Sequence, residues 1–132
     1  MTTAESYERS LLALCLYREA RGESRDAKVG VKHVILNRLA DPIPPYGLCD
    51  TIPKIILCPR QFSSFNRLDP NSSLMPLGTE LAWLECCEVV DADTQDPTGG
   101  ATHYYSDNIP APAWAEPAKF TVQIGAFRFY KL

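Results

Sequence analysis

Two glutamates, Glu19 and Glu23, lie four residues apart in the run LYREARGESRD, where their types and spacing could support acid–base chemistry. On a continuous helix, Glu19 lies three residues beyond Leu16 and seven beyond Leu12, so its side chain continues an apolar stripe. Partial desolvation and the negative end of the helix dipole both raise the pKa of a carboxyl group in that position. The pattern therefore favours Glu19 as a proton donor.

Three arginines, Arg18, Arg21 and Arg25, act in the opposite direction, because a nearby positive charge lowers the pKa of a carboxyl group. If they point outward, Glu19 stays protonated near neutral pH, which is the state that a general acid needs. If one of them pairs with Glu19, the carboxylate belongs instead to an ordinary ion pair at a helix end. Spacing alone leaves both interpretations open.

Glu23 follows Gly22, where the helix is expected to end, so spacing does not fix the distance between the two carboxyl groups. One hypothesis makes Glu23 a second active-site carboxylate. The other makes it a structural residue that caps the next helix or pairs with Arg25 or Lys28. Residue types alone do not decide between them.

A second group with chemical potential lies in the run THYYSDN, after a double glycine. A short strand there would present His103 and Tyr105 to one side and Tyr104 to the other. These residues either face a substrate or form an aromatic core strand with a surface histidine. A thiol nucleophile, Cys49, with His103 as base is a further possibility, but no activating partner is evident beside that cysteine.

Metal and cofactor sites are not expected, because the two histidines and five cysteines are scattered without ligand spacing. The cysteines form an odd set with no C-x-x-C pair. This argues against a disulfide framework and favours mostly reduced thiols. Cys49 and Cys58 are the one pair expected to bridge if the protein meets an oxidising compartment.

Three main helices and a small sheet are expected to position these residues, which predicts the α+β class. The helical segments, including a short additional one, have these expected limits: Thr2 to Gly22, Ser24 or Asp26 to Asp41, Pro53 to Leu57, and Thr79 to about Asp91. Thr2 and Glu5 have the spacing of a capping box, Ser24 or Asp26 is the expected cap of the second helix, and Thr79 is that of the last. In the last of them, Leu81, Leu84 and Val89 are expected to be buried. The C-terminal third alternates in polarity and predicts antiparallel strands at 101–105, 120–124 and 127–130.

The bulk composition fits one compact domain, residues 1–132, that is soluble and ordered. The formal charge is −3 and no long run of either sign occurs, which disfavours a general nucleic-acid binder. No apolar stretch reaches the ~20 residues that span a bilayer, and the first ten residues lack the pattern of an export signal. Cytoplasmic synthesis is therefore expected.

The run YREARGESRDAKVGVKHVILNRL resembles the start of the cell-wall hydrolase family typified by the spore-cortex-lytic enzyme SleB. The resemblance covers roughly Leu11 to Tyr130. It rests on ordered blocks: Glu19-Ala20-Arg21-Gly22-Glu23, Asn37-Arg38, Cys49-Asp50, Gln61-Phe62-Ser63, and the closing segment GGATHYYSDN…PAWA…TVQIGAFRFY.

The resemblance implies a lysozyme-like fold and an enzyme that acts on peptidoglycan glycan strands, with the first glutamate of the motif, Glu19, as catalytic acid. Family members are mostly described as lytic transglycosylases, in which one carboxyl group makes both proton transfers and the product is a 1,6-anhydro sugar. The alternative is a hydrolytic muramidase or glucosaminidase, which needs two carboxylates at about 5 to 9.5 Å, here Glu19 and Glu23. We favour the one-acid mechanism, with Glu23 tuning or positioning the site.

Further roles follow from the same resemblance. Four polar residues are predicted to bind acetamido and hydroxyl groups of the substrate: Gln61, Ser63, His103 and Tyr105. Phe62 and Tyr104 either stack on sugar rings or fill the core, and the core is favoured. Arg18 stands where a small residue is expected, so it either lowers the pKa of Glu19 or contacts the lactyl-peptide carboxylates of the substrate.

A short enzyme without an export signal or a separate wall-binding module most resembles a bacteriophage endolysin. Such a protein is made in the host cytoplasm and reaches the wall through a holin or a similar pore. We expect a monomer whose partner is peptidoglycan, with no nucleic acid and no stable membrane insertion. The alternative from another class is a non-catalytic wall-binding or phage-structural module with the same fold.

Overall fold

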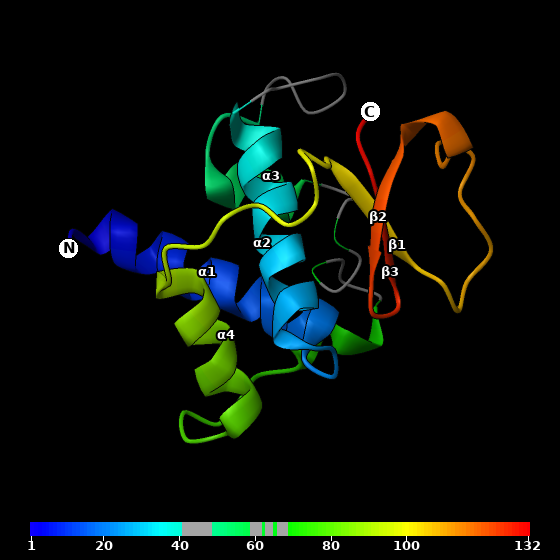
Figure 1. Cartoon of the computed structure of the whole chain (residues 1–132). Coiled ribbons are helices and arrows are strands. Elements are labelled where there is room, and N and C mark those ends of the chain that lie inside the picture. Colours follow the sequence, from blue (N-terminus) through cyan, green and yellow to red (C-terminus); the bar gives the residue numbers. More distant parts are fainter. Residues whose placement is uncertain (41–48, 59–61, 63–64, 66–68) are drawn as a thin grey trace.

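The computed structural model describes residues 1–40, 49–58, 62, 65 and 69–132. Within them the helices and strands have these bounds: α1 Thr3–Ala20, α2 Arg25–Ala40, α3 Ile52–Leu57, η3 Pro70–Ser73, α4 Leu81–Asp91, β1 His103–Ser106, η4 Pro117–Lys119, β2 Phe120–Ile124 and β3 Phe127–Tyr130. Figure 1 shows the α-helices gathered on one side and the sheet on the other. The α+β prediction is confirmed.

α1 begins at the predicted capping box, in which Thr2 and Glu5 exchange side-chain-to-backbone hydrogen bonds. Its buried residues include Leu12, Cys15 and Leu16, and the helix ends at Ala20. α2 starts five residues later and is capped by Ser24, whose Oγ accepts a hydrogen bond from the Ala27 N–H at 3.2 Å. The corner between the two helices therefore follows directly from their end signals, and it places Glu19 in the last turn of α1.

α4 differs from the sequence prediction in its start and in its buried face. The helix begins after Glu80, which makes no side-chain capping bond, so Thr79 as cap is wrong. Leu81 is 82% exposed and Leu84 is 48% exposed, whereas Val89 is fully buried as predicted. Apolar residues occupy both faces of this helix, so periodicity did not show which face α1 and α2 would cover.

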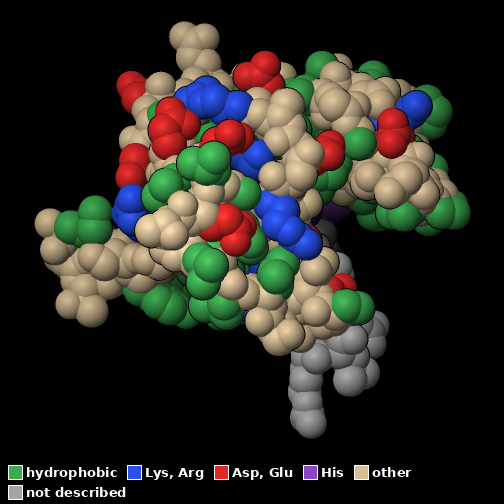
Figure 2. Space-filling view, turned by 90° about the horizontal axis from the view of Figure 1, so that it is seen from below, with side chains coloured by type: hydrophobic (Ala, Val, Ile, Leu, Met, Phe, Trp, Pro, Cys, Tyr) green, Lys and Arg blue, Asp and Glu red, His purple; other side chains and the backbone are tan. Residues whose placement is uncertain are grey.

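α2 holds α4 through basic side chains. Arg25 forms an ion pair with Glu88 at 2.8 Å, and Lys28 forms one with Glu85 at 2.9 Å. The buried Lys32 ammonium donates to the Val89 carbonyl at 3.0 Å, at the end of α4 where helix carbonyls lack partners. Seen from below, the molecule shows acidic and basic side chains interspersed on this face (Figure 2).

The sheet has the strand order β1-β3-β2 and is antiparallel throughout. Gly125 has a φ of +58°, which permits the tight turn between β2 and β3. Phe129 of β3 packs on α2, where a Cβ atom added to Gly30 would lie 2.7 Å from the Phe129 Cζ. Residues 107–119 form an excursion on the side of the sheet away from the helices (Figure 1).

No helix in the described part of the chain is long and apolar enough to cross a membrane.

Candidate active site

An open cavity of about 410 Å³ lies where the end of α1 meets the sheet. One side is formed by residues 18–23, which comprise the last turn of α1 and the corner before α2. The other sides are formed by Asn71 of η3, by Ser106 and Asn108 at the end of β1, and by Phe127 of β3. Glu19 and Glu23 therefore line the same cavity.

Glu19 is half-buried and follows buried residues of α1 along the helix. Two groups beside it are held in their neutral forms. Burial, followed by the nearby charge of Glu19, raises the pKa of the Cys15 thiol and of the Tyr104 hydroxyl well above their usual values. The helix stripe thus places the Glu19 carboxyl group at the boundary between the core and the cavity.

Arg18 is directed toward the segment after η3. Its Nε donates to the Leu74 carbonyl at 3.0 Å, its Nη2 lies 3.6 Å from the Met75 sulfur, and its guanidinium carbon lies 4.6 Å from the centre of the Phe65 ring. Burial lowers the pKa of this guanidinium, but an arginine stays charged at neutral pH. These contacts fix the segment that carries Asn71 to α1. Substrate binding by Arg18 stays a prediction.

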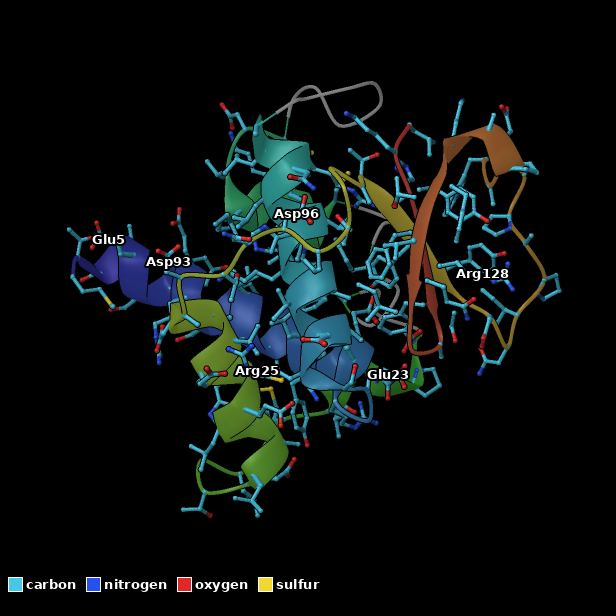
Figure 3. The ribbon with its side chains drawn as sticks, in the orientation of Figure 1. Glu5, Glu23, Arg25, Asp93, Asp96 and Arg128 are labelled. Atoms are coloured by element: carbon cyan, nitrogen blue, oxygen red, sulfur yellow. The ribbon has the colours of Figure 1, made fainter. Side chains whose placement is uncertain are left out.

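Glu23 makes neither of the two side-chain contacts that the structural hypothesis named. Arg25 pairs with Glu88 and Lys28 with Glu85, while Ser24 caps α2, so the predicted ion pair or cap is wrong. The Glu23 Oε1 instead accepts a hydrogen bond from the Ala126 N–H at 3.3 Å. Figure 3 shows Glu23 at the end of the sheet where this turn lies.

His103 and Tyr105 lie on the outer face of the sheet, away from the residues that line the cavity. His103 is 6% exposed, its Nδ1 shares a hydrogen bond of 2.9 Å with the Thr102 hydroxyl, and its ring lies 4.9 Å from that of Trp114. Burial, and then the Arg38 charge, lowers the pKa of His103 to about 4. The structure does not bring this pair together with Glu19, so their predicted role in binding sugar gains no support.

Tyr104 points to the opposite face, as the alternation predicted, and its ring lies 5.1 Å from that of Phe127 in the cavity wall. Phe62 is 1% exposed and lies beside the Arg38 guanidinium at 5.3 Å, which confirms a core position. Gln61 and Ser63 lie outside the described residues.

Sequence reasoning missed three polar residues of the cavity: Asn71, Ser106 and Asn108. Asn71 lies in the run DPNSS and the other two in SDN. Both runs carry turn signals, which explain the residue types without any function. Only the pairing of β1 with β3 brings the end of β1 to the corner after α1.

The alternative chemistries are not favoured by the described residues. Burial, together with the hydrogen bond that the Cys49 thiol donates to Cys58, raises the pKa of this thiol, which is the opposite of an activated nucleophile. This contact also places the two thiols of the expected bridging pair side by side, both reduced. In the described part of the chain, no group of three or more His, Cys, Asp or Glu residues is arranged to hold a metal ion.

Comparison with known proteins identifies the family. Residues 22–130 match the family model described as Cell Wall Hydrolase. The chain belongs to the cell wall hydrolase family. Glu23 lies inside the matched range, whereas Glu19 lies just before it.

Two curated members of the family are similar over most of this chain. The spore cortex-lytic enzyme of Oceanobacillus iheyensis is 32% identical over 126 residues, which cover 92% of this chain and 40% of that protein. The spore cortex-lytic enzyme of Halalkalibacterium halodurans is 35% identical over 105 residues, which cover 79% of this chain and 28% of that protein. The chain thus spans less than half the length of these relatives.

Two solved structures share the fold. The catalytic domain of the germination-specific lytic transglycosylase SleB from Bacillus anthracis is 28% identical, with a TM-score of 0.70 over 94% of this chain and 93% of that domain. The catalytic domain of the Bacillus cereus SleB protein is 29% identical, with a TM-score of 0.70 over 96% of this chain and 91% of that domain. The predicted resemblance to the SleB-typified family is confirmed.

Proposed function

We propose that this chain is a peptidoglycan-degrading glycosidase that cleaves the β-1,4 bond between N-acetylmuramic acid and N-acetylglucosamine as a lytic transglycosylase. The observation that carries the proposal is the place of Glu19, half-buried in the last turn of α1 and lining an open cavity. The similar solved domain from Bacillus anthracis is described as a lytic transglycosylase, which supports the reaction class.

In this mechanism the protonated Glu19 carboxyl group gives its proton to the glycosidic oxygen, and the bond from that oxygen to C1 of the muramoyl residue breaks. The resulting Glu19 carboxylate then removes the proton of the muramoyl 6-hydroxyl group. The freed oxygen closes onto C1 and forms the 1,6-anhydro ring. Glu19 ends protonated again, and no water is consumed.

The cavity offers groups that suit an N-acetylated glycan. The Asn71 and Asn108 carboxamides each provide donors and an acceptor for acetamido groups, and the Ser106 hydroxyl can do the same for sugar hydroxyls. Phe127 adds an apolar surface. These residues replace His103 and Tyr105 as the proposed binding set on the described part of the chain.

A hydrolytic muramidase or glucosaminidase is the second candidate, because Glu23 lines the same cavity as Glu19. Such an enzyme uses a pair of carboxylates, one on each side of the scissile bond. The Glu23 carboxylate already accepts a backbone hydrogen bond from Ala126, which favours the one-acid mechanism. A role as a phage endolysin released through a holin, and a monomeric state, stay predictions.

Glu19→Gln tests the proposal, because the amide keeps the shape of the side chain but cannot donate a carboxyl proton. Purified peptidoglycan sacculi are incubated with the protein, and the soluble fragments and the protein bound to the sacculi are measured. We expect wild type to release fragments and Glu19→Gln to bind sacculi but release none. Glu116→Gln serves as the matched control, because Glu116 is exposed and is the N-cap residue of η4. This variant should release fragments like wild type. A Glu19→Gln variant that still releases them would refute the assignment.

A further inference from the structure

The corner between α1 and α2 and the turn between β2 and β3 meet at one carboxylate. The Glu23 Oε1 lies 3.3 Å from the Ala126 nitrogen, although the two residues are 103 positions apart in the chain. The same oxygen would lie 3.4 Å from a Cβ atom placed on Gly125, so it packs directly against the backbone of the turn. Figure 3 shows Glu23 beneath this end of the sheet.

Glu23 is itself fixed to the helices by its backbone. Its N–H donates to the Ala20 carbonyl at 2.9 Å, and its carbonyl accepts from the Lys28 ammonium at 2.6 Å. Lys28 is buried and also paired with Glu85. The Glu23 side chain therefore starts from a backbone that is held on both sides, four residues after Glu19.

The turn that Glu23 contacts determines the position of the sheet-side wall of the cavity. The Ala126 carbonyl accepts a hydrogen bond from the Asp107 N–H at 2.7 Å, and the next residue, Phe127, pairs with Ser106. Ser106, Asn108 and Phe127 all line the cavity that Glu19 also lines. A shift of the turn would move these groups relative to Glu19 through the Asp107–Ala126 hydrogen bond and the pairing of β1 with β3.

We infer that Glu23 is a positioning residue that fixes the sheet-side wall at its working distance from Glu19, and not a second catalytic carboxylate. The inference rests on the proposed function of the cavity. A hydrogen bond from a backbone N–H needs an acceptor oxygen but not a negative charge, and the amide oxygen of glutamine also provides one. A nucleophile or a general base needs the carboxylate itself. The two roles therefore respond differently to glutamine and to alanine.

The test compares Glu23→Gln, Glu23→Ala and wild type on purified peptidoglycan sacculi. We expect Glu23→Gln to keep kcat/KM within about threefold of wild type, and Glu23→Ala to lose about tenfold or more, because misplaced binding groups impair catalysis steeply. Hydrogen exchange of the Ala126 amide supplies a local readout. This amide should stay protected in wild type and in Glu23→Gln, and should exchange faster in Glu23→Ala.

Three results would overturn the inference. A folded Glu23→Gln variant with a protected Ala126 amide and no activity would show that the carboxylate does chemistry. Glu23→Ala with the activity of wild type would show that the contact positions nothing. An unchanged exchange rate of the Ala126 amide in Glu23→Ala would show that Glu23 does not hold this amide in a hydrogen bond. If Glu23→Ala does not fold, the activity of Glu23→Gln decides alone. Failure of the proposed function would appear separately, as a wild-type protein that releases no fragments or a Glu19→Gln variant that does.

Discussion

Acidification should destabilise the fold through one buried histidine. His103 is 6% exposed, and its pKa is about 4 in the folded protein, against an ordinary value of 6.5. Between these pH values the unfolded chain binds a proton at His103 that the folded chain does not bind. The contribution of neutral His103 to the free energy of unfolding is therefore complete above about pH 6.5 and is lost as the pH falls toward 4.

The size of the effect follows from the two pKa values. Each pKa unit corresponds to about 1.4 kcal/mol, so the whole window from 6.5 to about 4 is worth about 3 kcal/mol. Between pH 7 and pH 5 the same relation gives a loss of about 2 kcal/mol. Such a loss is a large part of the stability of a small domain.

His103→Phe isolates this contribution. Phenylalanine keeps an aromatic ring against Trp114, and the Thr102 hydroxyl keeps its hydrogen bond from the Leu132 N–H at 3.2 Å. Urea unfolding is measured at pH 7 and at pH 5 for both proteins. His33, whose pKa is also lowered by burial, titrates in both and cancels in the comparison. We expect wild type to lose about 2 kcal/mol more than His103→Phe. An equal loss of unfolding free energy in the two proteins would refute the claim that His103 is neutral in the folded state.

Two further predictions concern the packing that supports the cavity. Gly30→Ala should lower the free energy of unfolding by about 1–3 kcal/mol, since its new Cβ would lie 2.7 Å from Phe129, whereas Gly78→Ala, with open space around it, should not. Equal urea midpoints for the two variants would contradict the close packing of α2 on β3. Arg18→Met should cost about 2 kcal/mol, because the Leu74 carbonyl loses a charged donor, and should also raise KM for peptidoglycan. An unchanged KM would contradict the claim that the Arg18 contacts position the cavity wall.

The helical half of the site could be predicted from the sequence because its signals are local. The Thr2 capping box, the stripe from Leu12 to Glu19 and the Ser24 cap each depend on residues within a turn or two, and the structure confirms them. The buried face of α4 could not be predicted, because its two leucines are exposed although Val89 is buried. Periodicity identifies a buried face only when one face alone is apolar.

The sheet half depended on contacts between distant segments. Alternation correctly separated Tyr104 from His103 and Tyr105, but it does not tell which side faces the cavity. Trp114, from the excursion before β2, covers the outer side. The partner of Glu23 is a backbone N–H more than a hundred residues away, and a backbone group leaves no residue-type signal in the sequence.

The central claim is that Glu19 alone transfers both protons and that no water enters the product. Digestion of purified peptidoglycan in H₂¹⁸O, followed by mass spectrometry of the fragments, tests it most directly. We expect muropeptides that end in 1,6-anhydro-muramic acid, lighter by one water than reducing ends and without ¹⁸O. Reducing ends that carry ¹⁸O would contradict the account and would assign the chain to the hydrolytic glycosidases.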